Sequence, residues 1–298
     1  MKQTNSVMKG AWQQACRQAL QWRLLVLWMI LLALPTLVLM LSGWFVLGRA
    51  LDHSVHAARI AASADISVLG DLINLADGEK AQVLSLTMIV SLLCTLALSP
   101  LMSGMAVTAL RAPHAPGFGA LLRGGAQEYG RMGRLLILGL VPLGLGLAAF
   151  GGLQKLAMKQ ADSAILYSDT RLTSYGTLAL GLLLLALAHA ILDSARADFA
   201  LDTRRRSAFK ALWRGLKSVC RRPLLTLWFY GSISLVAILL VLPLLWLRIN
   251  VPHSSWPGFV FALLLMQLVI AILAWMRNAR LFALAAIVRG NQPGGIVV

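Results

Sequence analysis

The sequence predicts an all-α integral membrane protein with six transmembrane helices. Hydrophobic residues make up 59% of the 298 residues and charged residues only 13%, whereas soluble domains usually contain about 45–50% apolar and about 25% charged residues. The mean hydropathy is +0.77, and the apolar residues gather in six long stretches. Soluble enzymes, disordered chains and small disulfide-stapled domains are therefore excluded as classes.

Each apolar stretch is close to, or longer than, the roughly 20 residues that a helix needs to cross a bilayer. Helices and closed barrels both satisfy their backbone polar groups inside lipid. The stretches are continuously apolar rather than alternating, which favours helices over barrel strands. The predicted spans are Leu24–Leu47, Val83–Leu110, Leu135–Leu153, Tyr175–Leu192, Leu224–Leu247 and Gly258–Trp275.

The distribution of basic residues predicts the orientation in the membrane. Twenty of the 27 Lys and Arg residues lie before the first span, in the second and fourth connections or after the last span, and seven lie in the other connections. Because basic segments stay on the cytoplasmic side, both termini are predicted to be cytoplasmic. The first apolar core, about 24 residues long, exceeds the 7–15 residues of a signal peptide. We therefore expect an uncleaved first span and a bacterial inner membrane.

Three parts of the sequence resemble one another, which predicts an internal repeat. Spans one, three and five open on paired leucines, with a small residue nine positions earlier, and spans two, four and six end on Thr-Ala-Leu or Phe-Ala-Leu. We interpret residues 1–298 as one membrane domain of three units, each an interfacial amphipathic helix followed by a helical hairpin. The units cover about 8–110, 118–201 and 207–290.

The third interfacial segment has the clearest helical pattern. Apolar residues recur at steps of three and four from Phe209 to Cys220, with basic residues between them. This pattern is typical of a helix that lies flat on a membrane. Basic residues near an anionic leaflet contribute about 1 kcal/mol each, although these charges are also consistent with a role in orientation alone. The expected contacts with lipid headgroups are Lys210, Trp213, Arg214, Lys217, Arg221 and Arg222.

Ionisable residues are scarce in the predicted spans, with an exception at the cytoplasmic end of the fourth. His189, Asp193 and Arg196 are spaced by four and three residues, which places them on one helix face. We expect Asp193 to pair with Arg196, or with Arg277 or Arg280 of the sixth span. Ionisable residues inside spans mark functional sites by default, so this face is a candidate gate. The alternative is an ion pair that ties helix ends near the interface.

Other residues offer little catalytic or metal-binding chemistry. His53 and His56 lie three apart in the first outside loop, but a zinc site needs further ligands and only the distant His253 is expected on that side. No phosphate-binding Gly-Lys-Ser/Thr loop and no Gly-x-Ser-x-Gly elbow is present. We therefore expect no metal, no cofactor and no enzymatic activity. The cysteines imply no disulfide.

Two segments of the predicted connections carry further expectations. The apolar residues of the first outside loop predict a short packed helix within residues 60–75. The basic run Arg204–Arg206 has no aromatic platform beside it. A nucleic acid partner is therefore not expected.

Several short motifs resemble a broad set of bacterial six-helix inner-membrane proteins. These motifs are the Gly10–Trp12 opening, the Ala-Leu-Trp-Arg-Gly-Leu segment at Ala211–Leu216, and the Arg-Arg-Pro sequence at Arg221–Pro223 before the fifth span. The set includes domains of unknown function and the membrane domain attached to some glycerophosphodiester phosphodiesterases. The resemblance covers most of the chain but does not extend to the phosphodiesterase domain, so it implies a membrane fold and no activity.

Two functions remain open. The chemically bare spans and the repeat favour a non-enzymatic envelope scaffold or accessory subunit that contacts anionic lipid of the cytoplasmic leaflet. The alternative is a transporter or flippase for a lipid-like or amphipathic substrate, with a gate near His189 and Asp193. A membrane protein partner is compatible with either function.

Overall fold

A computed structural model describes residues 2–51, 79–163, 167–202, 207–251 and 255–290. These residues form eight helices. The helix predicted in the first outside loop lies outside the described residues, and so do His53, His56 and His253. The helices are α1 (Lys2–Ala19), α2 (Trp22–Leu51), α5 (Glu79–Arg111), α6 (Phe118–Ser163), α7 (Tyr167–Leu201), α8 (Ala208–Arg221), α9 (Pro223–Asn250) and α10 (Trp256–Gly290).

Six of the described helices, α2, α5, α6, α7, α9 and α10, are long and apolar enough to cross a membrane. Each contains one predicted span, which confirms an all-α multi-pass membrane protein. The helices extend beyond the predicted limits. The sixth candidate span reaches Arg289 rather than Trp275, because Arg277 and Arg280 end the apolar run without interrupting the helix.

Local sequence explains why the third interfacial helix is separate from the fifth span. Ser207 caps α8 by accepting a hydrogen bond from the backbone N–H of Lys210 at 3.4 Å. Pro223 opens α9, where its missing N–H is tolerated. No such break precedes the third span. The predicted second interfacial segment is instead continuous with that span in α6, a single helix of 46 residues, or about 69 Å.

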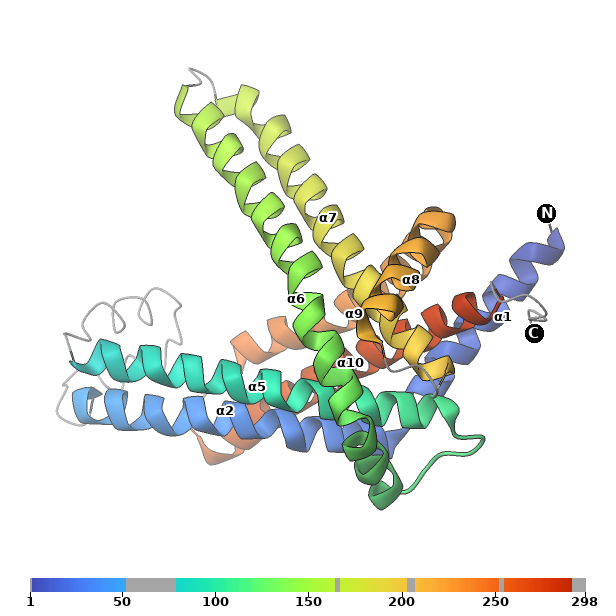
Figure 1. Cartoon of the computed structure of the whole chain (residues 1–298). Coiled ribbons are helices and arrows are strands. Elements are labelled where there is room, and N and C mark those ends of the chain that lie inside the picture. The colour runs from blue at the N-terminus through green and yellow to red at the C-terminus, as the bar shows by residue number, and fades with distance from the viewer. Residues whose placement is uncertain (1, 52–78, 164–166, 203–206, 252–254, 291–298) are drawn as a thin grey trace.

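The six long helices form three antiparallel hairpins that diverge from a common centre. Within the hairpins, α2 packs on α5, α6 on α7, and α9 on α10. Figure 1 shows the α6–α7 hairpin leaving the centre in a different direction from the α2–α5 hairpin, with α9 and much of α10 behind them. The six helices therefore do not form a single closed bundle.

The remaining segments join the hairpins to one another at the centre. Helix α1 packs on α10, the first part of α6 packs on α5, and α8 packs on α7. Each predicted interfacial segment thus contacts the last helix of another hairpin. We call this central region the hub. Here α1 and α8 meet the adjoining ends of α2, α5, α6, α7, α9 and α10.

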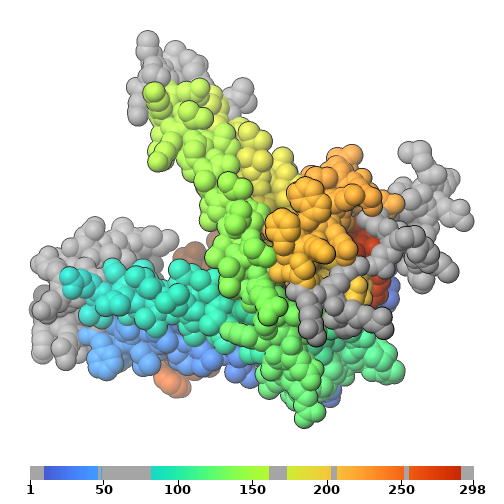
Figure 2. All heavy atoms as spheres, viewed as in Figure 1, coloured from blue at the N-terminus to red at the C-terminus, as the bar shows by residue number. Residues whose placement is uncertain are grey.

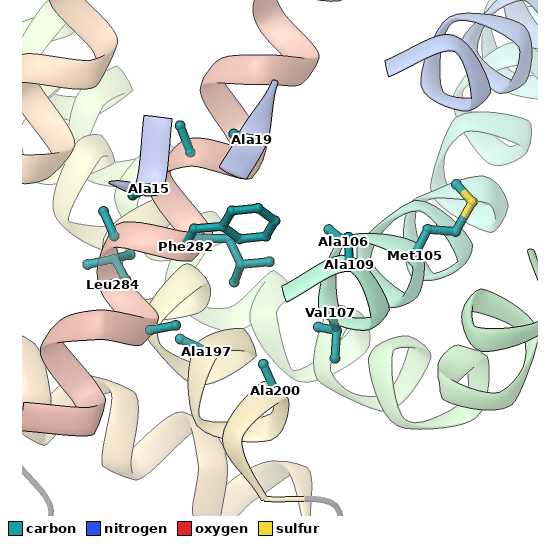
Figure 3. Packing of buried hydrophobic residues seen from close by; sticks show 14 of the residues in the cluster. Ala15, Ala19, Met105, Ala106, Val107, Ala109, Ala197, Ala200, Phe282 and Leu284 are labelled. Atoms are coloured by element: carbon teal, nitrogen blue, oxygen red, sulfur yellow. The ribbon is translucent and has the colours of Figure 1, made fainter. Parts of the chain in front are cut away.

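Small residues bring the helices of the hub close together. Figure 3 shows Ala15 and Ala19 of α1 beside Phe282 and Leu284 of α10, and all four side chains are buried. Alanine and glycine allow helix backbones to approach closely, which is how helices gain contact energy in lipid. Small side chains therefore allow the close crossings of the hub, and large buried side chains such as Phe199 and Met105 fill the space between the helices.

Glycines make the closest crossings in the hub. A Cβ atom on Gly104 of α5 would lie 2.8 Å from the carbonyl oxygen of Gly125 of α6. A Cβ atom on Gly215 of α8 would lie 2.7 Å from the carbonyl oxygen of Ile191 of α7. Since both obstacles are backbone atoms, neither position accepts a side chain unless the helices separate.

The outer parts of the hairpins, which we call the arms, make few contacts across hairpins. At most 22% of the residues in the most apolar window of each span are buried within the protein. Figure 2 shows the α6–α7 arm standing clear of the rest of the molecule. Many large apolar side chains are exposed here, as expected for surfaces that face lipid. The arms comprise about 34–48 with 82–97, 137–160 with 173–187, and 235–250 with 256–268.

Candidate functional site

The candidate site lies where α7 enters the hub. Asp193 and Arg196 of α7 form an ion pair, with 2.6 Å between Oδ1 and Nη1, and both side chains are buried. A buried pair with good geometry is costly to break, because removal of either partner leaves the other charge in a poorly solvated place. Of the partners expected for Asp193, the structure places Arg196 in contact.

His189 does not join this ion pair. The residue is exposed, and its Nδ1 atom lies 3.0 Å from the carbonyl oxygen of Leu185 in its own helix. His189 lies four residues nearer the arm than Asp193, a rise of about 6 Å along the helix. Spacing alone placed the three residues on one face, but only Asp193 and Arg196 are covered by other helices.

The two arginines of α10 have neutral partners. Arg280 donates to the hydroxyl of Tyr230 at 3.0 Å, to the hydroxyl of Ser234 and to the sulfur of Met276. The Arg277 guanidinium lies 5.4 Å from the centre of the Trp28 ring, a cation–π arrangement. Among the described residues, neither Arg277 nor Arg280 has a carboxylate within ion-pair distance.

A small cavity lies beside the ion pair. Its volume is about 10 Å³, which is about the space that one water molecule needs. Four helices contribute to its wall, so the cavity exists only in the assembled hub. The lining residues are Trp28 of α2, Ser103 and Ala106 of α5, Asp193 and Arg196 of α7, and Arg277, Asn278 and Leu281 of α10.

Helix α8 has three distinct faces rather than the two that the sequence predicts. The buried face consists of Ala208, Ala211, Gly215 and Val219, and it packs on α7. The large apolar residues lie on a second face, where Phe209 and Trp213 are 66% and 62% exposed. The third face is basic and exposed; it carries Lys210, Arg214, Lys217 and Arg221.

The predicted headgroup contacts of α8 and its end are all at the surface. Lys210, Trp213, Arg214, Lys217, Arg221 and Arg222 are exposed. Arg214 also lies 3.9 Å from Asp198 of α7, so this arginine is partly held toward the hub. The other basic side chains of α8 point away from the packed face.

A second charged cluster was not anticipated from the sequence. Glu128 of α6 accepts hydrogen bonds from Arg111 of α5 at 2.6 Å and from Arg131 of α6 at 2.7 Å. Both arginines also donate to carbonyl groups at the end of α7. Arg111 donates to Phe199 and Ala200, at 2.8 and 2.7 Å, and Arg131 donates to Asp202, the residue that follows the helix, at 2.9 Å. Arginine at a helix C-terminus satisfies carbonyls that have no partner within the helix.

One sequence signal could have found this cluster. Glu128 is the sole acidic residue between Arg111 and Arg134, a segment with several arginines. From the sequence these arginines are expected to set the orientation in the membrane, whereas in the structure two of them clamp the end of α7 to α5 and α6. We call Arg111, Glu128 and Arg131 the arginine clamp.

Helix α1 is anchored to the hub by two tryptophans. The indole N–H of Trp12 donates to the hydroxyl of Ser232 of α9 at 3.1 Å. The indole N–H of Trp275 of α10 donates to the carbonyl oxygen of Cys16 at 3.0 Å. Cys16 is buried, and this burial raises the pKa of its thiol. Part of the predicted first interfacial helix is thus covered by protein.

Comparisons with protein-family models, curated proteins and solved structures gave no match to this chain. The resemblance to six-helix inner-membrane proteins therefore stays a prediction. Within the described residues no three His, Cys, Asp or Glu side chains gather closely enough to hold a metal ion, and Cys16, Cys94 and Cys220 are free.

Proposed function

We propose that this multi-pass membrane protein is a non-enzymatic scaffold or accessory subunit of a bacterial inner membrane that contacts anionic lipid through α8. The observation that carries this proposal is the division of α8 into three faces. Its small face packs on α7, so the exposed apolar face and the exposed basic face remain for a different surface. That combination matches the boundary between headgroups and acyl chains.

The position of α8 also fits this role. Its 14 residues extend about 21 Å, and Pro223 opens a span immediately after it. The helix is therefore tied to the membrane at one end, and Trp213 stands on its exposed apolar side. Tryptophan is enriched at the membrane interface because its ring is apolar and its N–H is polar. With the basic residues predicted on the cytoplasmic side, α8 and both termini would face the anionic leaflet.

The packing of the hub supports the proposed threefold repeat. Three interfacial segments, α1, the first part of α6, and α8, each contact the last helix of another hairpin. In units of about 8–110, 118–201 and 207–290, this is a cyclic arrangement in which every unit supports its neighbour. A scaffold built this way would hold three apolar arms apart in the bilayer, available to lipid or to a membrane protein partner.

The lipids that accompany the protein out of the membrane test the α8 proposal. Replacement of Lys210, Arg214, Lys217 and Arg221 by Gln removes the basic face. Because each basic residue near the surface contributes about 1 kcal/mol, the anionic lipid fraction in polymer-extracted nanodiscs should fall to the bulk value, with the protein still in the membrane. The matched control replaces four exposed arginines elsewhere, Arg17, Arg123, Arg134 and Arg289, by Gln. Equal lipid composition in the wild type and the α8 variant would refute the proposal.

A transporter or flippase for a lipid-like substrate is the second candidate. It is favoured by the buried charges of Asp193 and Arg196 on α7. In that role Asp193 and Arg196 would form part of a gate. Asp193→Asn should then stop the movement of a fluorescent phospholipid across proteoliposome membranes, whereas the exposed His189→Gln should not. The cavity beside the pair is only about 10 Å³, which favours the scaffold. Unchanged lipid movement in Asp193→Asn would remove this gate from consideration.

A further inference from the structure

The cavity beside Asp193 is lined by residues with buried polar atoms that have no hydrogen-bond partner in the described part of the chain. Asn278 is 1% exposed, and neither its Nδ2 nor its Oδ1 atom has a hydrogen-bond partner among the described residues. The indole Nε1 of Trp28 is likewise buried and without a partner there. Both residues line the cavity. A buried donor or acceptor without a partner costs about 1–3 kcal/mol, so groups of this kind gathered in one cavity point to a polar ligand.

The charges around the cavity favour a negative ligand. Asp193 is matched by Arg196 at 2.6 Å, so that pair contributes little net charge. Arg277 lines the same cavity, and no carboxylate of the described residues lies within ion-pair distance of it. Arg280 lies three residues farther along α10, and in the described part of the chain it donates hydrogen bonds to neutral groups only. Charges taken out of water in proteins are normally paired. Arg277 and Arg280 are both partly buried, so the excess charge beside the cavity is positive.

The span limits predicted from the sequence place the cavity near the level of lipid headgroups. Arg277 lies two residues after Trp275, where the predicted sixth span ends, and Trp28 lies one turn inside the start of the first apolar run. Arg196 likewise follows the last residues of the fourth predicted span. By these predicted limits the cavity lies near the ends of three spans, on the side of the two chain termini, where we expect the phosphate groups of the lipids; α7 and α10 themselves continue past it.

We propose that this cavity binds one anionic oxygen of a phosphate group. Arg277 supplies the charge, and Nδ2 of Asn278, Nε1 of Trp28 and the Ser103 hydroxyl are the hydrogen-bond donors that line the cavity. A volume of about 10 Å³ takes a single oxygen, so the rest of the group lies at the mouth. The phosphate belongs either to a lipid headgroup or to free phosphate, since both present the same chemistry. This site is separate from α8, so the two proposals can fail independently.

Thermal unfolding in a neutral detergent tests the site. Wild-type protein is titrated with inorganic phosphate at constant ionic strength set by NaCl, and separately with phosphatidic acid or with diacylglycerol of the same acyl chains in mixed micelles. A ligand that binds only the folded state raises Tm with its concentration. We expect a rise with phosphatidic acid and none with diacylglycerol. A rise with inorganic phosphate as well identifies free phosphate as a second source.

Three variants assign the effect to the cavity. Arg277→Gln and Asn278→Leu should increase the half-saturating ligand concentration at least tenfold, and Trp28→Phe, which removes one N–H and keeps an aromatic ring, should increase it by a smaller factor. Arg289→Gln, an exposed arginine of the same helix, should leave it unchanged. Without ligand, Arg277→Gln should have a Tm equal to or above that of the wild type, because it removes a charge that has no carboxylate partner.

The outcomes separate cleanly. A Tm rise that is lost in Arg277→Gln and kept in Arg289→Gln supports the site, whichever phosphate source produces it. No rise in the wild type with phosphate or with phosphatidic acid overturns it, even if a variant fails to fold. A rise of equal size in the wild type, Arg277→Gln and Trp28→Phe also overturns it, because the phosphate would then bind elsewhere.

Discussion

The hub and the arms are made of the same helices but follow different packing rules. In the hub, small side chains let backbones touch, and charged groups bridge helix ends. In the arms, large apolar side chains face outward, and contacts are mostly within one hairpin. The difference shows that contacts at one end of the spans decide how the three hairpins are placed relative to one another. The residue types on the arms are instead those expected for surfaces that face lipid.

Replacement of a glycine by a bulky residue should have the most different effects on stability in the hub and in the arms. In the hub, Gly104→Leu forces α5 away from α6, because the Gly125 carbonyl oxygen lies 2.8 Å from the position of the new Cβ atom. Overpacking of this kind typically costs about 1–3 kcal/mol. The cost should be higher here because the obstacle is a backbone atom, which cannot move aside like a side chain. In the arm, Gly144 of α6 has nothing within 4 Å of that position. We expect Gly104→Leu to lose the monodisperse peak in size-exclusion chromatography and Gly144→Leu to keep it. If the two variants gave the same elution profile, the hub would accept a large side chain as readily as the arms do.

The arginine clamp should give the next largest effect. Glu128→Leu leaves Arg111 and Arg131 without their shared carboxylate, and we expect a loss of about 3 kcal/mol, at the low end for a buried pair because both arginines keep some exposure. Hydrogen exchange should become faster first in the last turn of α7. The control Arg123→Gln changes an exposed residue of the same helix and should stay within about 0.5 kcal/mol. Unaltered exchange in α7 would show that the clamp does not hold that helix end.

Thiol labelling should separate the interior of the hub from its surface. Cys16 is buried and its thiol pKa is raised, whereas Cys220 on α8 is exposed. Since the thiolate is the reactive form, a raised pKa lowers the reactive fraction at neutral pH, and labelling of Cys16 should increase as the pH rises. We expect at least a tenfold slower reaction with a maleimide at Cys16 than at Cys220, measured in the two single-cysteine proteins. Similar rates would place α1 away from α10 in the membrane.

The smallest effect is expected for a polar contact on the arm side. The hydroxyl of Ser91 of α5 donates to the carbonyl oxygen of Pro35 of α2 at 3.0 Å. Hydrogen bonds between transmembrane helices average about 0.6 kcal/mol, so Ser91→Ala should lower the unfolding free energy by about that amount. Steric trapping or denaturant unfolding in micelles measures it. A loss above about 2 kcal/mol would show that the α2–α5 hairpin depends on polar contacts as the hub does.

Much of the fold could be predicted because the relevant signals are local. An apolar run of sufficient length forms a helix in lipid wherever it stands in the chain, and this produced the six spans. The second interfacial segment was predicted to be a separate helix, but it is continuous with the third span because no residue between them breaks α6. Before the fifth span, by contrast, Pro223 begins a new helix, α9.

The candidate site was less predictable because it depends on partners far away in the chain. Spacing on α7 placed Asp193, Arg196 and His189 on one face. In the structure Asp193 and Arg196 form an ion pair, whereas the other helices leave His189 exposed. The stripe from Phe209 to Cys220 on α8 was expected to be one apolar face. Periodicity could not tell that the small residues of α8 would be the buried ones, since that choice is made by the shape of α7.

The sequence by itself determined the all-α membrane class, the six spans and the basic, amphipathic character of α8, because composition and periodicity act within single helices. The tertiary structure alone decided which charges are matched and which polar groups remain buried without partners. Arg111 meets Ala200 across 89 residues, and the cavity at Asn278 is assembled from four helices. Such contacts follow from how closely helix backbones approach, which in this protein is decided by glycines and alanines at the crossings.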